Sequence, residues 1–104
     1  MPEHDKTLLM IGLAVKAGRV AAGAELVCEA VRKGRARLVI LSAQASANTI
    51  KKVTNCCAYY HSEYIIIDAD RDQLGRCAGR EGSLSCLAVK DENLAKAIKA
   101  SVDR

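Results

Sequence analysis

The chain has 104 residues, enough for one domain with one hydrophobic core and too few for a second functional module. Half of the residues are apolar and 27% are charged, a balance typical of folded globular proteins and not of disordered or fibrous chains. The net charge of +4 favours a polyanionic partner only weakly, because surplus lysines are common on protein surfaces. We therefore expect residues 1–104 to form a single domain, with its core from about residue 6 to 100.

The first half of the chain alternates helix-like and strand-like patterns. Residues 5–17 predict an apolar helix that ends at Gly18 and is buried on most sides. Residues 19–21 predict a short strand, after which Gly23 begins a second helix. Helical spacing predicts that the buried face of this second helix contains Leu26, Val27, Ala30 and Val31. Residues 38–41 are apolar and partly β-branched, which predicts an interior strand.

The second half continues the same alternation. Ser46 or Asn48 can cap the next helix, and residues 64–67 are apolar enough to predict a second interior strand. The remaining predicted elements are a short helix at 70–78 broken by Gly75 and Gly79, a strand at 84–89, and a final helix capped by Asp91. Helices that alternate with strands in this way predict an α/β sandwich, in which helices cover a sheet.

No part of the sequence predicts membrane insertion, secretion or disulfide bonding. The apolar run at 8–15 falls far short of the roughly 20 residues that span a bilayer. The first residues lack a basic stretch followed by an apolar one, so no secretory signal is predicted. The five cysteines are odd in number and form no C-x-x-C pair, which predicts free thiols. The expected location is the cytoplasm.

No group of residues predicts catalysis. Cys57 and His61 are four residues apart, as half of a metal site would be, but no second ligand pair accompanies them and packing is the better explanation. The glycine-rich segment 75–82 lacks the G-K-[ST] of a phosphate-binding loop. We therefore expect no enzymatic activity, no metal, no cofactor and no small-molecule substrate.

The distribution of charged and aromatic residues limits the kinds of nucleic-acid recognition that this chain could use. The segment 16–37 contains six basic residues and two acids, whereas 68–72 is an acidic turn, so we expect a basic side. The chain has no Phe or Trp. The three tyrosines, Tyr59, Tyr60 and Tyr64, cluster at one helix-to-strand junction, where core or rim packing is expected rather than base stacking. RNA recognition would therefore rely on polar groups and shape.

Several blocks of this sequence resemble the large-subunit ribosomal protein seven-Ae and thirty-e superfamily. The blocks include LAVKAGRV at 13–20, EAVRKG at 29–34, ARLVI at 36–40 and ASANT at 45–49. The resemblance covers about residues 6–100 and is closest to the short bacterial YlxQ-like members. It implies a three-layer α/β/α sandwich with a mixed sheet. It also implies recognition of the kink-turn, a bent RNA internal loop with tandem sheared G·A pairs.

The recognition helix departs from the superfamily pattern. In that superfamily the helix begins G-x-N-E-x-x-K. Here Gly23 matches, but the Asn, Glu and Lys positions are Glu25, Leu26 and Glu29. A carboxylate where a lysine meets RNA changes the local charge by two units and repels phosphate. Two explanations stay open: Glu29 is only a solvated partner of Lys33, or the chain accepts a different RNA to which Glu25 hydrogen-bonds.

The resemblance implies one RNA-binding edge built from four segments. These are the first-strand region, the helix that follows it, the loop around Gln44, and the loop at 80–83. The candidate RNA-binding residues are Lys16, Arg19, Gly23, Ala24, Glu25, Leu26, Glu29, Arg32, Lys33, Gln44, Arg80, Glu81, Gly82 and Ser83. The expected partner is structured RNA, ribosomal or other, with ribosomal proteins as further candidates. The alternative is a protein-binding adaptor that has lost kink-turn recognition, with Glu25 and Glu29 facing a basic partner.

Overall fold

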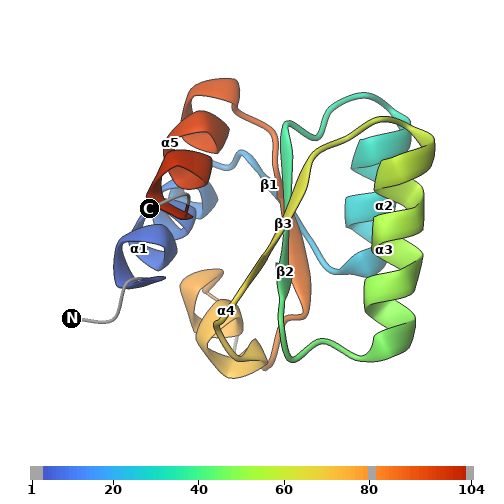
Figure 1. The fold of residues 1–104 in the computed structure, drawn as a ribbon. Coiled ribbons are helices and arrows are strands. Elements are labelled where there is room, and N and C mark those ends of the chain that lie inside the picture. The colour runs from blue at the N-terminus through green and yellow to red at the C-terminus, as the bar shows by residue number, and fades with distance from the viewer. Residues whose placement is uncertain (1–3, 80–81, 103–104) are drawn as a thin grey trace.

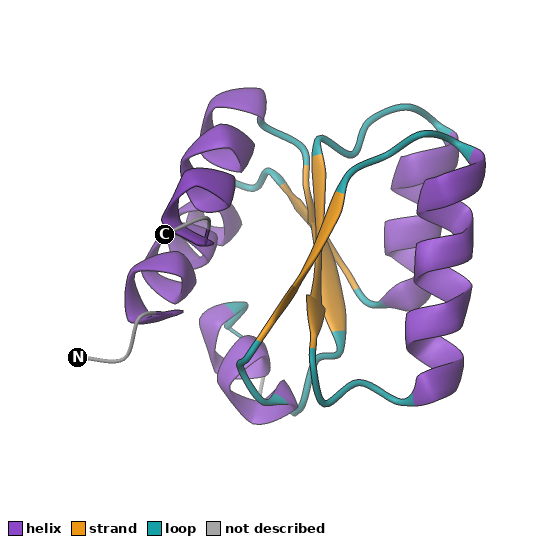
Figure 2. Cartoon of the chain, in the orientation of Figure 1, coloured by secondary structure: helices purple, strands orange, loops and turns teal. Residues whose placement is uncertain are grey.

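The computed structural model describes residues 4–79 and 82–102, and in it helices cover both faces of one sheet, forming a three-layer α/β/α sandwich (Figures 1 and 2). In chain order the elements are α1 (His4–Lys16), β1 (Val20–Ala22), α2 (Ala24–Arg32), β2 (Leu38–Ser42), α3 (Ala47–Tyr59), β3 (Tyr64–Ile67), α4 (Arg71–Cys77), β4 (Cys86–Val89) and α5 (Glu92–Val102). The predicted fold class is confirmed. Among the described residues, no helix has the length and apolar character needed to cross a membrane.

The sheet is mixed and has the strand order β1-β4-β2-β3. β2 pairs in parallel with β3 and antiparallel with β4, and β4 pairs antiparallel with β1. Helices α1, α4 and α5 lie on one face, and α2 and α3 lie on the other (Figure 1). The two interior strands, β2 and β4, are buried along their whole length because both of their faces are covered.

Two hydrophobic clusters, one on each face of the sheet, form the core. Leu38 and Ile40 of β2 belong to the cluster under α1, α4 and α5, whereas Val39 and Leu41 belong to the cluster under α2 and α3. This alternation follows from the two-residue side-chain period of a strand. It explains why residues 38–41 appear in the sequence as an uninterrupted apolar run.

The prediction that residues 64–67 form an interior strand is wrong, because β3 is an edge strand. Ile67 is buried, but Tyr64 and Ile66 remain 44% and 46% exposed on the face that α2 and α3 cover elsewhere. Tyr59 and Tyr60 are also exposed, so the tyrosines lie on the surface and not in the core. The apolar run specified a strand but not its position in the sheet.

Two predictions of helix burial are also wrong. Leu9 and Leu13, four residues apart on α1, are 67% and 52% exposed, so this helix is not buried on most sides. Leu26 of α2 is 55% exposed, whereas Val27, Ala30 and Val31 are buried as predicted. Leucine side chains that fit the apolar pattern can still lie beyond the edge of the covered face.

Short-range signals set several helix ends. Ser46 caps α3 by accepting a hydrogen bond from the Thr49 backbone N–H, as predicted. Asp70 and Gln73 form a reciprocal capping box at the start of α4. Gly75 does not break α4, contrary to the prediction, but lies inside it. The final strand begins at Cys86, two residues later than expected.

Candidate functional site

The strand register defines two ends of the sheet, and the predicted site residues are divided between them. At one end, here called the Gly23 end, β1 leads to α2, β2 leads to α3, and the segment after α4 leads to β4. Ala22 is paired with Leu87 there, and Ser42 with Ile67. At the other end, here called the Arg37 end, α1 leads to β1, α2 to β2, and β4 to α5. Val89 is the register partner of residues on both neighbouring strands at that end.

Gly23 fixes the start of α2 at the Gly23 end. Its backbone N–H donates to the carbonyl oxygen of Cys86 at 3.0 Å, which ties the loop to β4. Its φ of 95° lies in the left-handed region, which favours glycine. Because glycine has no side-chain oxygen, α2 begins without a side-chain cap, and the first backbone N–H groups of the helix lack intrahelical acceptors. Such N–H groups suit an anionic or carbonyl oxygen from a ligand.

The loop around Gln44 is held by a buried serine. The Ser42 hydroxyl is fully buried and donates to the Ala69 carbonyl oxygen at 2.6 Å. The same oxygen accepts from the Gln44 backbone N–H at 3.0 Å. The Ala43 backbone N–H donates to the Ile67 carbonyl oxygen at 2.9 Å. These bonds fix the backbone and leave the Gln44 side chain exposed at the Gly23 end.

The segment at 82–85 completes the Gly23 end. The Ser42 backbone N–H donates to the Ser85 carbonyl oxygen at 2.8 Å, and the Leu84 N–H donates to the Arg71 carbonyl oxygen at 2.9 Å. Gly75 allows this segment to lie directly against α4, since a Cβ there would be 2.0 Å from the Gly82 carbonyl oxygen. Ser83 is exposed. The candidate residues Arg80 and Glu81 lie outside the described residues.

The structure does not place all four predicted segments on one edge. Gly23, Ala24, Glu25 and Leu26 lie with Gln44, Gly82 and Ser83 at the Gly23 end. Lys16 and Arg19 lie instead at the Arg37 end, because the Lys90 backbone N–H donates to the Arg19 carbonyl oxygen there. Arg32 and Lys33 close α2 at that same end. The expectation of a single edge is therefore wrong: β1 runs the length of the sheet and carries Arg19 and Gly23 to opposite ends.

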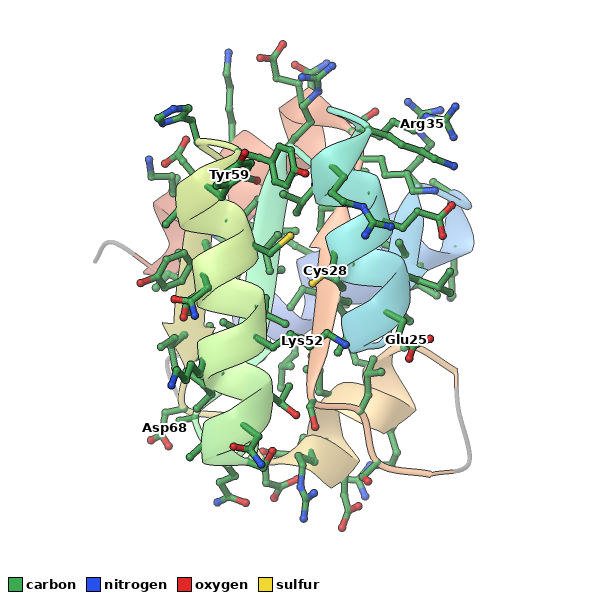
Figure 3. The ribbon with its side chains drawn as sticks, turned by 90° about the vertical axis from the view of Figure 1, so that its right-hand side faces the viewer. Glu25, Cys28, Arg35, Lys52, Tyr59 and Asp68 are labelled. Atoms are coloured by element: carbon green, nitrogen blue, oxygen red, sulfur yellow. The ribbon has the colours of Figure 1, made fainter. Side chains whose placement is uncertain are left out.

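Charged residues are distributed unevenly between the Gly23 end and the Arg37 end. Figure 3 shows Glu25 and Asp68 toward one end of the molecule and Arg35 at the other. The Gly23 end carries the carboxylates of Glu25, Asp68, Asp70 and Asp72 together with the exposed basic side chains of Lys51, Lys52 and Arg71. The Arg37 end carries a larger number of basic side chains than acidic ones: Lys16, Arg19, Arg32, Lys33, Arg35 and Arg37, against Glu63, Asp91 and Glu92. The predicted basic side is thus an end of the molecule, and it lies opposite the loops that define the Gly23 end.

Glu29 lies on α2 between the two ends and forms an ion pair within the helix. Its carboxylate accepts a hydrogen bond from Lys33 Nζ at 2.7 Å. This hydrogen bond and the lysine charge hold the pKa of Glu29 below its ordinary value. Both side chains are about half exposed, so solvent screens the pair and it contributes little to stability. The explanation of Glu29 as a solvated partner of Lys33 therefore agrees with its surroundings.

The cysteines are packed as apolar groups. Cys28, Cys57 and Cys86 are buried in the cluster under α2 and α3, next to the partly exposed Cys56. Burial raises the pKa of Cys57 and of Cys86 to about 11, so both thiols stay protonated at neutral pH. His61 is exposed whereas Cys57 is fully buried, so the two do not form half of a metal site. No group of three metal ligands occurs within the part of the chain that the structure describes.

Sequence reasoning passed over three residues of the Arg37 end. Arg35, Arg37 and Lys90 were not candidates, although the first two belong to the basic segment at 16–37. The Lys90 backbone bonds to Arg19, and the Arg37 backbone N–H donates to the Val89 carbonyl oxygen at 2.8 Å. The pairing of β4 between β1 and β2 brings them together, and local sequence patterns do not specify that order.

Comparison with known proteins identifies similar sequences and similar folds. A profile of the ribosomal protein L7Ae/L30e/S12e/Gadd45 family matches residues 5–99. A Bacillus subtilis (strain 168) protein named RNA-binding protein YlxQ is 39% identical over 94 residues, which cover 90% of this chain and 92% of the relative. An Enterococcus faecium protein of the same name is 40% identical over 57 residues, or 55% of each chain.

Two solved structures share the fold. A Bacillus halodurans protein described as having unknown function superposes with a TM-score of 0.88 at 33% identity, covering 95% of this chain and 98% of the other. A Giardia lamblia 15.5kD RNA binding protein superposes with a TM-score of 0.80, covering 99% of this chain and 90% of the other. At 21% identity, this second similarity supports the fold alone.

Proposed function

Because the chain belongs to the ribosomal protein L7Ae/L30e/S12e/Gadd45 family, we propose that it is a non-catalytic cytoplasmic protein that binds structured RNA through its Gly23 end. Kinked RNA of the kink-turn type is the class that fits best, in ribosomal RNA or in another structured RNA. The convergence of the Gly23, Gln44 and Ser83 loops at one end of the sheet carries this proposal.

The chemistry of the Gly23 end suits a bent RNA backbone. The uncapped start of α2 offers backbone N–H donors, Gln44 offers an amide with donors and an acceptor, and Ser83 offers a hydroxyl. Groups of this kind bind sugar-phosphate oxygens and the edges of splayed bases. The hydrogen bonds at Gly23 and Ser42 fix the backbone of these loops before binding, which lowers the ordering cost.

Glu25 limits affinity for phosphate at this end. It is exposed in the first turn of α2, close to the uncapped backbone N–H groups that begin the helix. A carboxylate there repels phosphate, although it can accept hydrogen bonds from base amino groups. A second candidate function is a protein-binding adaptor, which the carboxylates of Glu25, Asp68 and Asp72 favour because they would attract a basic partner.

Titration of the protein against two RNAs tests the proposal. One RNA contains a kink-turn, and the other is the same RNA with the sheared G·A pairs replaced by Watson–Crick pairs. We expect the kinked RNA to bind roughly tenfold more tightly or better, with an affinity that falls steeply as salt rises. Equal affinity for both RNAs would refute recognition of the kink. Absence of binding to either would favour the adaptor.

Glu25→Asn measures the contribution of the carboxylate, with Glu92→Asn as a matched control. Both glutamates are exposed in the first turn of a helix, so the two variants change net charge and helix-dipole stabilisation alike, but Glu92 lies at the Arg37 end, opposite the Gly23 loops. We expect Glu25→Asn to tighten kink-turn binding by roughly tenfold, since hydrogen bonds and charges at RNA contacts are worth ~1.5–3 kcal/mol. An equal effect of the two variants would show that the contribution of Glu25 is not specific to the Gly23 end.

A further inference from the structure

We propose that the Arg37 end is a second RNA contact surface, which binds the sugar-phosphate backbone independently of sequence. The inference rests on the proposed RNA-binding function and adds a site at the opposite end of the sheet from the Gly23 loops. Its members come from three turns: Arg19 after α1, Arg35 and Arg37 between α2 and β2, and Lys90 after β4.

Two helices end at this surface with the same backbone motif. Gly18 and Gly34 have φ values of 71° and 70°, and each is followed directly by an arginine. The Arg19 N–H donates to the Ala14 carbonyl oxygen at 3.1 Å, and the Arg35 N–H donates to the Ala30 carbonyl oxygen at 2.9 Å. Together with the glycine N–H bonds to Val15 and Val31, these contacts form two Schellman motifs. The motifs fix the Cα positions of both arginines while their side chains stay exposed.

The guanidinium groups at this end are available to a ligand. No described carboxylate forms an ion pair with Arg19, Arg35 or Arg37, although Glu63 and Glu92 line a shallow pocket together with Arg37. Arginine side chains carry only donors, so they suit phosphate oxygens and cannot accept from bases. Their grouping makes the local potential positive, because basic side chains at this end outnumber the carboxylates of Glu63, Asp91 and Glu92.

RNA fits this surface better than an acidic peptide does. Tyr59 lies toward the same end in Figure 3 and is 77% exposed, with its ring edge-on to Tyr60 at a centroid distance of 4.8 Å. An exposed tyrosine ring provides a face on which an unpaired base can stack. Basic residues at the carboxyl ends of helices, such as Arg19 and Arg35, also stabilise those helices through the macrodipole, so the test must measure RNA binding and not stability alone.

The test compares Arg19→Gln/Arg35→Gln with Lys6→Gln/Arg76→Gln. Both variants remove two exposed positive charges, but Lys6 and Arg76 lie on α1 and α4, away from the Arg37 end. The probe is the kink-turn RNA with one arm extended by a helical turn or more. We expect Arg19→Gln/Arg35→Gln to weaken binding roughly tenfold or more and to flatten the slope of log K against log salt by about 1.4 to 1.8. Because Arg76 lies next to Gly75 near the Gly23 end, the control variant should flatten the slope by no more than about 0.7 to 0.9, the contribution of one charge.

The outcomes separate this inference from the proposed function. If Arg19→Gln/Arg35→Gln loses affinity for the extended RNA but keeps the preference for kinked over straightened RNA, both surfaces bind as proposed. If it behaves like the control variant, the second surface is refuted while the Gly23 end is unaffected. An acidic peptide that competes with the RNA only in the wild type and the control variant would show that the surface binds polyanions in general, which would overturn its assignment to RNA.

Discussion

Gly75 and Gly12 make a matched pair of glycines inside helices, and their replacement by alanine should have opposite effects on stability. A Cβ on Gly75 would lie 2.0 Å from the Gly82 carbonyl oxygen and 3.3 Å from the Ser83 Cα. Non-bonded heavy atoms lie about 3.5 Å apart, so the segment at 82–83 would have to move by more than about 1 Å. A Cβ on Gly12 would meet only Cys77, at 3.8 Å from its Sγ and 3.9 Å from its carbonyl oxygen, which are ordinary contacts.

The magnitudes follow from helix propensity and packing. Alanine is favoured over glycine in a helix interior by about 1 kcal/mol, and both substitutions gain this amount. Overpacking against a backbone costs ~1–3 kcal/mol, and contact with main-chain atoms places Gly75→Ala at the upper end of this range. We therefore expect Gly12→Ala to raise the free energy of unfolding by up to about 1 kcal/mol and Gly75→Ala to lower it by about 2 kcal/mol.

Urea denaturation followed by circular dichroism measures both changes. With m-values of ~1–3 kcal/mol per molar urea, a difference of about 3 kcal/mol separates the two midpoints by roughly 1 M or more. Equal stability of Gly75→Ala and Gly12→Ala would contradict the close contact between Gly75 and Gly82. That result would mean that the segment at 82–85 does not pack against α4, and the Ser83 loop could not then be part of a fixed Gly23 end.

Two other predictions concern buried polar and thiol groups. Ser42→Ala should lower the free energy of unfolding by ~1–3 kcal/mol, because it leaves the Ala69 carbonyl and the Gln44 N–H without their partner. Ser83 is exposed, so Ser83→Ala should change the free energy of unfolding by less than about 0.5 kcal/mol in the same urea titration. Burial raises the pKa of Cys57 and of Cys86 to about 11. In the unfolded chain these thiols lose their protons near pH 9, whereas in the folded chain they keep them. The free energy of unfolding should therefore fall between about pH 9 and pH 11. Cys57→Ala/Cys86→Ala should flatten this fall, and an unchanged pH slope would contradict the assignment.

Much of the fold could be predicted because its signals are local. Gly18 and Gly23 mark helix boundaries through backbone conformations that glycine favours, and Ser46 caps a helix with its own hydroxyl. By contrast, whether a strand is at the edge of a sheet depends on which other strands pair with it. Residues 38–41 and 64–67 are almost equally apolar, yet one strand is interior and the other is an edge. Nothing within either run distinguishes these outcomes.

Only part of the arrangement of the candidate site could be predicted, because that arrangement also depends on which strands pair. Gly23, Gln44 and Ser83 are brought together by β4, which joins the three loops through the Cys86 carbonyl oxygen and the neighbouring Ser85. Arg19 is only four residues from Gly23, so proximity in sequence suggested one surface. A strand rises about 3.3 Å per residue, and four extended residues therefore separate the two positions by about 13 Å. Sequence distance is a poor guide to which end of a sheet a residue occupies.

The separation of charge has a kinetic consequence if both ends bind RNA. Basic residues outnumber acidic ones at the Arg37 end, whereas the Gly23 end carries both signs, and this asymmetry orients the molecule in the field of a polyanion. The Arg37 end would therefore meet RNA first and would govern the association rate and its salt dependence, because long-range charge acts on encounter. The Gly23 end acts only at contact, where its hydrogen bonds govern the dissociation rate. Stopped-flow measurements should accordingly show that Arg19→Gln/Arg35→Gln changes mainly the association rate. Ser42→Ala, which acts through Gln44, should change mainly the dissociation rate.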